Sequence, residues 1–303
     1  MYFNFKQMKH YKSLIELHRE NGFTPPEHPL ISLYHCNNTC SLGDREFTTD
    51  FYMVGFKKLK SGIIKYGRTK YDHESGYMLF VKPRQVIEMK DLHFEENGFL
   101  IFFHEDFLNG HTLHNEIKDY HYFDYETNEA LHLSPKEEQI VWGIYNALQT
   151  EYENNQDEFS RELMLTNIGT MLKYAQRFYK RQFINRTDLS GKTVSRFNDV
   201  LTKYFKQDQL QLKGLPSVNM MADQLNISPR YLSDLLKQET GKTAIELIHI
   251  FLISEAKNLL RSADQSVAEI AYYLGFENMS YFSRLFKQEV GVSPVQFKKQ
   301  QLN

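Results

Sequence analysis

The spacing of apolar and polar positions differs between the first and the later parts of this chain of 303 residues. From about Ser32 to His104, short runs of β-branched and aromatic residues alternate with turn residues, a pattern typical of strands. The predicted strands are Phe51–Leu59, Gly62–Tyr66, Tyr77–Val81, Gln85–Met89 and Phe99–His104. Many short, closely spaced strands favour a small barrel or jelly roll in this half of the chain.

Beyond this region the apolar positions follow the period of an α-helix. Ser134 is a good N-cap and Pro135 suits the first helical position, so we expect a helix from there to about Tyr152. A second helix, from about Asp157 to Phe183, carries an apolar stripe on one side. The stripe could pack against the neighbouring barrel or against a second subunit, and the sequence leaves both alternatives open.

The pattern predicts two domains. The polar segment Gln182–Lys192, which contains Gly191, is interpreted as a connector. From Thr193 onward the sequence predicts only helices of about 8 to 18 residues with short turns between them. The expected fold class is therefore α+β, with domains at residues 1–185 and 186–303. Two domains also suit the length, because single cores rarely grow beyond about 250 to 300 residues.

A duplication inside the second domain is the strongest signal. Ala222 and Leu225 recur 49 positions later as Ala271 and Leu274. Downstream the offset becomes 50, and seven of eleven residues recur. The recurring residues are Tyr231, Ser233, Leu235, Lys237, Gln238, Glu239 and Gly241, matched by Tyr281, Ser283, Leu285, Lys287, Gln288, Glu289 and Gly291. Two copies of one unit are present, at about 217–239 and 266–289.

Each copy has the features of a helix-turn-helix. Asn226 and Gly275 occupy the turns, and both residue types tolerate a left-handed backbone. The second helix of each copy begins after Ser228 or Asn278, which are good N-cap residues. These helices end at glycines, Gly241 and Gly291.

The second helix of each copy has an apolar and a polar side. The apolar sides are predicted to be buried and consist of Leu232, Leu235, Leu236, Phe282, Leu285 and Phe286. The polar sides consist of Arg230, Ser233, Asp234 and Lys237 in the first copy and Met279, Ser280, Ser283, Arg284 and Lys287 in the second. One such side could be ordinary solvated surface, but two on matched scaffolds predict a pair of DNA-reading helices. The segment Ala244–Arg261 between the copies is predicted to form one helix of about 25 Å, which could hold the reading helices about one DNA turn apart.

The charge distribution agrees with a nucleic-acid partner. The net charge is −2, but residues 191–303 carry 14 Lys and Arg against 11 Asp and Glu. The C-terminal third is therefore mildly basic, as expected of a domain that binds phosphates.

The sequence predicts a cytoplasmic protein without a membrane partner. No segment approaches the roughly 18 uninterrupted apolar residues that a spanning helix requires. The most apolar one, Ala244–Leu252, is interrupted by Glu246 and His249. Met1–His10 lacks the apolar segment of a secretory signal peptide.

Residue types that commonly act in catalysis or bind metals form no catalytic or metal-binding pattern in this sequence. Cys36 and Cys40 could in principle bind a metal or sense oxidation, but no second ligand pair follows, and two ordinary thiols are the favoured interpretation. Histidines that lie close in sequence are interpreted as surface or core residues: His104, His111, His114 and His121. No Gly-rich phosphate loop is present either. We expect no catalytic residue, no metal and no cofactor, and therefore not an enzyme.

The second copy of the repeat resembles the DNA-binding domain of the AraC/XylS family of bacterial transcription factors. The resemblance rests on the segment from Ala268 to Pro294, AEIAYYLGFENMSYFSRLFKQEVGVSP, and extends over about residues 193–299. Two departures are visible. Asn226 replaces a common turn glycine, and Phe251 stands where the spacer helix often carries arginine, which makes an arginine contact from that helix doubtful.

The resemblance implies a set of DNA-contacting residues. They are Arg230, Tyr231, Ser233, Asp234, Lys237, Asn278, Met279, Ser280, Tyr281, Ser283, Arg284 and Lys287. In such a set arginine can bind guanine through two hydrogen bonds, aspartate can accept from cytosine, and methionine can pack on the methyl group of thymine.

The N-terminal half resembles, more loosely, the cupin-like sensor domain of many family members. The resemblance lies in architecture and in stretches such as Tyr120–Tyr125. It implies a homodimer formed through helices like those at 135–183, a small-molecule effector whose site is unknown, and RNA polymerase as a partner of an activator. Two alternatives remain: a regulator of this family without a ligand, or a DNA-repair enzyme with the same DNA-binding domain. The repair enzyme would need more cysteines than Cys36 and Cys40 to hold its zinc.

Overall fold

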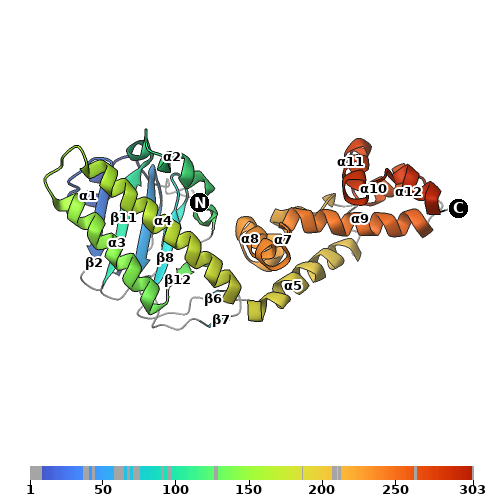
Figure 1. Cartoon of the computed structure of the whole chain (residues 1–303), viewed down its shortest axis with the longest axis horizontal. Coiled ribbons are helices and arrows are strands. Elements are labelled where there is room, and N and C mark those ends of the chain that lie inside the picture. The colour runs from blue at the N-terminus through green and yellow to red at the C-terminus, as the bar shows by residue number, and fades with distance from the viewer. Residues whose placement is uncertain are drawn as a thin grey trace, which may run out of the picture. The chain divides into compact units, whose positions relative to one another are not determined.

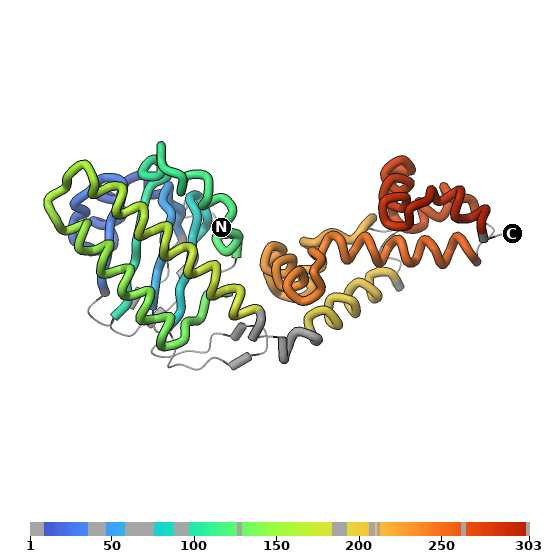
Figure 2. The backbone as a smooth tube through the Cα atoms, viewed as in Figure 1, coloured from blue at the N-terminus to red at the C-terminus, as the bar shows by residue number. Residues whose placement is uncertain are grey.

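The computed structural model describes residues 9–36, 41–42, 45–57, 65–66, 69–70, 76–89, 92–93, 97–125, 129–185, 187–206, 210, 213–262 and 265–301. The chain divides into two compact units, Met1–Gln182 and Phe183–Asn303 (Figure 2). All the described strands lie in the first unit, and the described elements of the second unit are helices. None of the described helices is both long enough and apolar enough to span a membrane.

The larger sheet of the first unit is antiparallel and has the strand order β12-β8-β5-β11-β2. Its strands are β2 (Ile31–Cys36), β5 (Phe51–Lys57), β8 (Tyr77–Val81), β11 (Gly98–His104) and β12 (Leu131–His132). A smaller sheet has the order β1-β4-β9 and contains β1 (Lys9–Tyr11), β4 (Arg45–Thr49) and β9 (Ile87–Met89). Two further pairs join β3 (Ser41–Leu42) to β10 (Leu92–His93) and β6 (Lys65–Tyr66) to β7 (Thr69–Lys70).

Both faces of the larger sheet are covered, which explains why β11 is apolar without alternation. Leu100 and Phe102 face a core shared with the smaller sheet and with helix α1 (Leu14–Asn21). Phe99 points to the other face, where its ring stacks on Tyr145 with centroids 4.2 Å apart. Strands buried on both faces are expected to be apolar at successive positions.

The outer face of the larger sheet is covered by two long helices, α3 (Pro135–Glu153) and α4 (Ser160–Asn185), as Figure 1 shows. The predicted start of α3 is confirmed. The Ser134 side chain accepts a hydrogen bond from the backbone of Glu137, and the Glu137 carboxylate accepts one from the Ser134 backbone (2.8 Å). Shorter helices connect these elements: α2 (Leu113–Glu116), η1 (Glu105–Leu108), η2 (Ile117–Asp119) and η3 (His121–Asp124).

The sheet-rich part of the predicted fold is confirmed. β8 spans the predicted residues, β9 is two residues shorter than expected, and β5 is described up to Lys57. Part of the predicted strand Gly62–Tyr66 lies outside the described residues, as does Cys40. The cupin-like connectivity stays a prediction.

The C-terminal end of α4 is bonded to the edge strand β12. The Gln182 side chain accepts from the backbone N–H of His132 (2.9 Å) and donates to the carbonyl of Ala130 (3.3 Å). Arg181 donates to the His132 carbonyl (2.7 Å) and forms an ion pair with Glu137 (2.7 Å). This end of the helix is therefore held by backbone groups of the sheet edge.

The second unit consists of helices around one core. They are α5 (Thr187–Lys206), α7 (Val218–Leu225), α8 (Pro229–Thr240), α9 (Ala244–Ser262), α10 (Val267–Tyr273), α11 (Met279–Val290) and α12 (Pro294–Gln301). The core takes side chains from α5 and from all of α7 to α12. It includes Leu252 and Ala256 of the predicted spacer helix, which forms α9.

Helix extends into the segment Gln182–Lys192, which was interpreted as a connector, and its role between the two domains stays a prediction. α4 continues to Asn185, and α5 begins at Thr187 and includes Gly191. Lys, Arg and Gln are good helix formers, and one glycine costs only about 1 kcal/mol in a helix interior. The polar composition was therefore compatible with helix as well as with loop.

Candidate nucleic-acid interface

The turn of the first copy is built as its sequence predicted. Ser217 caps α7, and the helix ends at Asn226, whose φ of 55° and ψ of 47° are left-handed. Ser228 then caps α8 by accepting a hydrogen bond from the backbone N–H of Tyr231 (3.3 Å). Gly241, with φ of 74°, ends α8. Each of these cap and turn residues has the backbone conformation that its residue type favours.

The second copy repeats this construction. Ser266 and Glu269 form a capping box at α10, and Asn278 caps α11 through the backbone N–H of Tyr281 (3.0 Å). Gly275 in the turn has a φ of 82°. A Cβ there would lie 3.2 Å from the carbonyl carbon of Gly214, so the turn needs glycine both for its backbone and for space.

The inward sides of both reading helices are buried, as predicted. All six residues are buried: Leu232, Leu235, Leu236, Phe282, Leu285 and Phe286. All of them except Leu235 belong to the core cluster of the second unit. Both helices also pack against α9. One apolar core therefore fixes two helices whose other sides remain available.

The outward sides match position by position at an offset of 50. Arg230, Ser233, Asp234 and Lys237 correspond to Ser280, Ser283, Arg284 and Lys287. The first and last residue of each set are exposed, and in the second copy Arg284 is exposed as well. Ser233, Asp234 and Ser283 are half-buried. Since i, i+3, i+4 and i+7 share one side of a helix, each set forms a single stripe.

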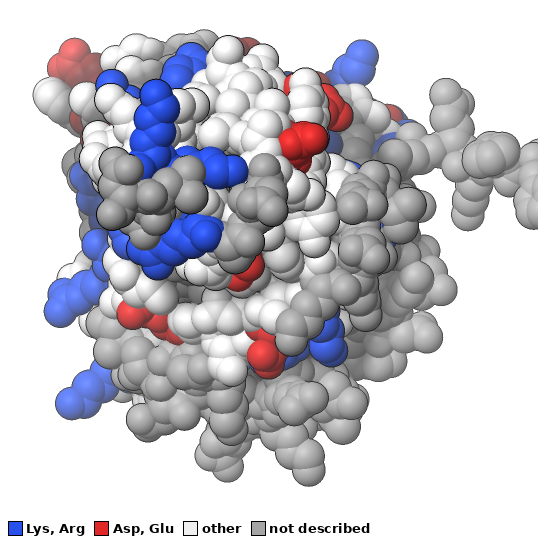
Figure 3. Space-filling view, turned by 90° about the vertical axis from the view of Figure 1, so that its right-hand side faces the viewer, with Lys and Arg blue, Asp and Glu red and all other residues white. Residues whose placement is uncertain are grey.

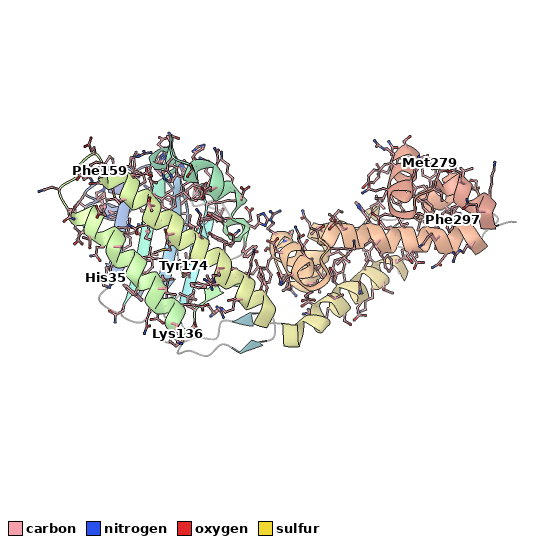
Figure 4. The ribbon with its side chains drawn as sticks, viewed as in Figure 1. His35, Lys136, Phe159, Tyr174, Met279 and Phe297 are labelled. Carbon is pink, nitrogen blue, oxygen red and sulfur yellow. The ribbon has the colours of Figure 1, made fainter. Side chains whose placement is uncertain are left out.

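The beginning of α11 adds two of the predicted residues to the second stripe. Asn278 is exposed at the N-cap, and Met279 is half-buried and packs partly against the core. Figure 4 shows Met279 at the start of α11 and Phe297 in α12. Figure 3 views the molecule from the end of the second unit, where several Lys and Arg side chains gather at the upper left and acidic ones are scattered.

Tyr231 differs from the other predicted contact residues because it is buried. Its side chain is only 2% exposed, whereas its counterpart Tyr281 is 38% exposed. A buried ring cannot reach DNA without local rearrangement, so the outward stripe of α8 does not include it. The two tyrosines occupy matching positions of the repeat, so the sequence did not predict that their exposure differs.

His249 of α9 was not among the predicted residues. Its Nε2 lies 3.2 Å from the hydroxyl of Tyr281. Burial lowers the pKa of His249, while the nearby carboxylates of Glu289 and Glu246 act in the opposite direction. The available signal was weak: His249 is a polar residue that interrupts an otherwise apolar segment.

Phe251 and Glu239 complete the environment of the reading helices. Phe251 packs against the core of the second unit, with its ring 5.7 Å from that of Phe205. It therefore takes a packing role at the position of the absent arginine. Burial raises the pKa of Glu239, near the end of α8, to about 7. Its counterpart Glu289 in α11 is exposed.

Among the described residues, no group of three or more His, Cys, Asp and Glu side chains is arranged to hold a metal ion.

Comparisons with known proteins agree with this construction. A family described as a helix-turn-helix domain matches residues 221–300. The HTH-type transcriptional activator RhaS of Escherichia coli O157:H7 is 40% identical over 74 residues, which are 24% of this chain and 27% of RhaS. The chain thus matches about a quarter of the length of this curated relative.

Solved structures were also matched. The C-terminal domain of the response regulator AraT from Geobacillus stearothermophilus is 34% identical, with a TM-score of 0.32, covering 36% of this chain and 84% of that one. A Chromobacterium violaceum regulator described as containing an AraC-type DNA-binding domain is 18% identical, with a TM-score of 0.32, covering 38% and 96%. The proteins named here are described as regulators of transcription or of response.

Proposed function

We propose that the second unit is a DNA-binding domain of the AraC type and that the protein is a sequence-specific transcriptional regulator. The observation that carries the proposal is the pair of polar stripes on α8 and α11, presented by one shared core. In a helix-turn-helix the second helix enters the major groove, where its side chains meet the base edges. Two such helices would read two successive stretches of one duplex.

The proposed contact residues are those of the two stripes with Asn278, Met279 and Tyr281; Tyr231 is left out because it is buried. Arg284 and Asp234 occupy matching positions but carry opposite charges. Arginine recognises guanine and aspartate accepts from cytosine, so the two helices would prefer different bases. Lys237 and Lys287, one turn further along, would bind phosphates.

We further propose that the first unit binds a small effector and that the protein is an activator. The sheet-rich architecture of the first unit supports the effector, and the similarity to RhaS, a transcriptional activator, supports the activator. The mechanism would be a population shift, in which the effector favours the arrangement that binds DNA. Effector and DNA must then change each other's affinity by the same factor.

The proposal includes a homodimer formed by α3 and α4, acting in the cytoplasm with RNA polymerase. Apolar side chains exposed on these helices support the dimer: Phe159 is 62% exposed and Leu163 is 44% exposed, and Ile140 of α3 is also exposed. Figure 4 shows Phe159 at the start of α4. Exposed apolar residues on long helices are frequent at subunit interfaces.

The decisive experiment is the selection of DNA from a random duplex pool by the full-length protein, with and without a metabolite extract. We expect an enriched sequence with two conserved stretches about one helical turn apart. A pool that stays random under both conditions would contradict the DNA-binding function. Enrichment that does not depend on the extract would favour the alternative of a ligand-independent regulator.

The remaining alternative, a repair enzyme with a zinc-bound cysteine, is tested by zinc analysis of the purified protein. We expect no stoichiometric zinc, because the chain has only Cys36 and Cys40.

A further inference from the structure

A polar contact joins the spacer helix α9 to the second reading helix α11. His249 lies in α9, and its Nε2 is 3.2 Å from the hydroxyl oxygen of Tyr281 in α11. The two rings have centroids 6.5 Å apart and are inclined by 72°. Tyr231, the counterpart of Tyr281, is buried, whereas Tyr281 is more than one third exposed.

Tyr281 stands at a position where a DNA phosphate is expected. It is the third residue of α11, directly after Met279 and Ser280. The first turn of a helix carries unpaired N–H groups and a partial positive charge, which favour an anion. Asn278 uses one of these N–H groups, that of Tyr281 itself, while the phenol side chain remains exposed.

The donor and acceptor atoms of His249 and Tyr281 determine the order of the hydrogen bonds from the imidazole ring through the hydroxyl to a phosphate. A tyrosine hydroxyl has one proton to donate and can accept as well, and a histidine ring nitrogen can donate. If His249 Nε2 donates to the Tyr281 oxygen, the Tyr281 proton is directed to a further acceptor. A DNA phosphate oxygen can accept a hydrogen bond from this hydroxyl, and it carries no proton to donate in return.

We propose that His249 is a positioning residue, which orients the hydroxyl of Tyr281 to donate to one DNA phosphate beside the site read by α11. Because α9 also packs against α11, the His249–Tyr281 contact would fix how deeply α11 enters the major groove of the DNA. The inference deepens the proposed DNA-binding function and rests on it.

The test uses the full-length protein and the duplex selected above, with four variants. His249→Phe keeps an aromatic ring but removes the donor, and Tyr281→Phe removes only the hydroxyl. His249→Gln retains an N–H donor and should restore part of the affinity. Tyr272→Phe is the matched control, because Tyr272 of α10 is another exposed tyrosine of the same unit.

We expect His249→Phe and Tyr281→Phe each to weaken binding about 3- to 10-fold, and the double variant to be no weaker than Tyr281→Phe alone. Both should abolish ethylation interference at one and the same phosphate, in the half-site read by α11. The salt dependence of binding should keep its slope, because the contact involves no cation. Tyr272→Phe should bind like the wild type. A general loss of folding would not produce this pattern, since it would weaken both half-sites.

Three outcomes would overturn the inference. Unchanged affinity in Tyr281→Phe would remove the phosphate contact. Additive losses in the double variant, or an interference signal that survives in His249→Phe, would remove the positioning role. If the wild-type protein selects no DNA at all, the proposed function itself fails, and that result is distinct from all the others.

Discussion

The two helix-turn-helix copies share their scaffold but not their surroundings. Both begin their second helix at a side-chain cap, bury three apolar residues at matching positions and end at a left-handed glycine. The copies nevertheless differ at residues that are identical in sequence. Tyr231 is buried and Tyr281 is exposed, while Glu239 is half-buried and Glu289 is exposed.

The difference follows from the neighbours of each copy. α7 and α8 pack against α5, whereas α10 and α11 have no contact of similar extent with that helix among the described elements. The Tyr231 ring packs on Phe183, at the end of α4, with centroids 5.2 Å apart, and Glu239 meets the backbone of Val194 in α5. Their counterparts Tyr281 and Glu289 are exposed. Identity within a repeat therefore predicts local conformation well and burial poorly.

The largest effects are expected in the shared core. Phe282→Ala should destabilise the second unit by about 3 to 5 kcal/mol, and Leu232→Ala at the matching position by about 2 to 5 kcal/mol, because both side chains are fully buried. Hydrogen exchange of α8 and α11 in urea measures the loss. The fluorescence of Trp142, the only tryptophan, reports on the first unit and serves as the control. If Phe282→Ala left α8 fully protected, the two copies would not share one cooperative core.

The next effect concerns DNA specificity. Arg284→Ala should cost about 1 to 3 kcal/mol of binding and relax the preference at one base position. Lys287→Ala should instead weaken binding to all sequences and lower the salt slope by about 1. Binding measured against single-base variants of the selected site, at several salt concentrations, separates the two. If both substitutions were silent, the assignment of the outward stripe would be wrong.

The two turns predict a smaller difference. Gly275→Ala should cost about 1 to 2 kcal/mol, because alanine is strained at a φ of 82° and its Cβ would meet the backbone of Gly214. Asn226→Gly should change stability by no more than a few tenths of a kcal/mol, since asparagine already tolerates the left-handed conformation. Urea unfolding of both variants provides the comparison. Equal costs would show that the two turns are not under different constraints.

The smallest expected effect depends on pH. Burial raises the pKa of Glu239 to about 7, so the folded protein favours the protonated carboxyl. The cost of ionisation is absent below the ordinary pKa of about 4.3, grows as the pH rises to about 7 and is fully present above that. Glu239→Gln should therefore stabilise the protein by about 1 kcal/mol at pH 8, after allowance for solvent screening, and have no such effect at pH 4. Thermal unfolding at both pH values, with the exposed Glu289→Gln as control, checks this. A gain that was equal at both pH values would have another cause.

Much of the local structure was predictable because single residues determine it. Ser134, Asn226, Gly275 and Asn278 have the cap or turn conformations that their types favour. The three-four spacing of apolar residues in α8 and α11 correctly identified their buried sides. These features depend on neighbours within one or two turns of the chain.

The features that the sequence did not reveal depend on distant neighbours. The burial of Tyr231 is a tertiary feature, and the partner of His249 lies 32 positions away in another helix. The helical structure within Gln182–Lys192 was not predicted, because polar composition suits both a loop and a helix. The contact residues of the two reading helices remain predictions until a complex with DNA is tested.

The Gln182 side chain has a consequence for the behaviour of the sheet. β12 is an edge strand, and an edge offers unpaired backbone groups to any strand of another molecule. Gln182 accepts from His132 and donates to the carbonyl of Ala130, as the peptide group of an added strand would. Arg181 takes the His132 carbonyl, so two side chains occupy backbone groups of this edge that an added strand would use. Both come from a helix, which cannot itself extend the sheet.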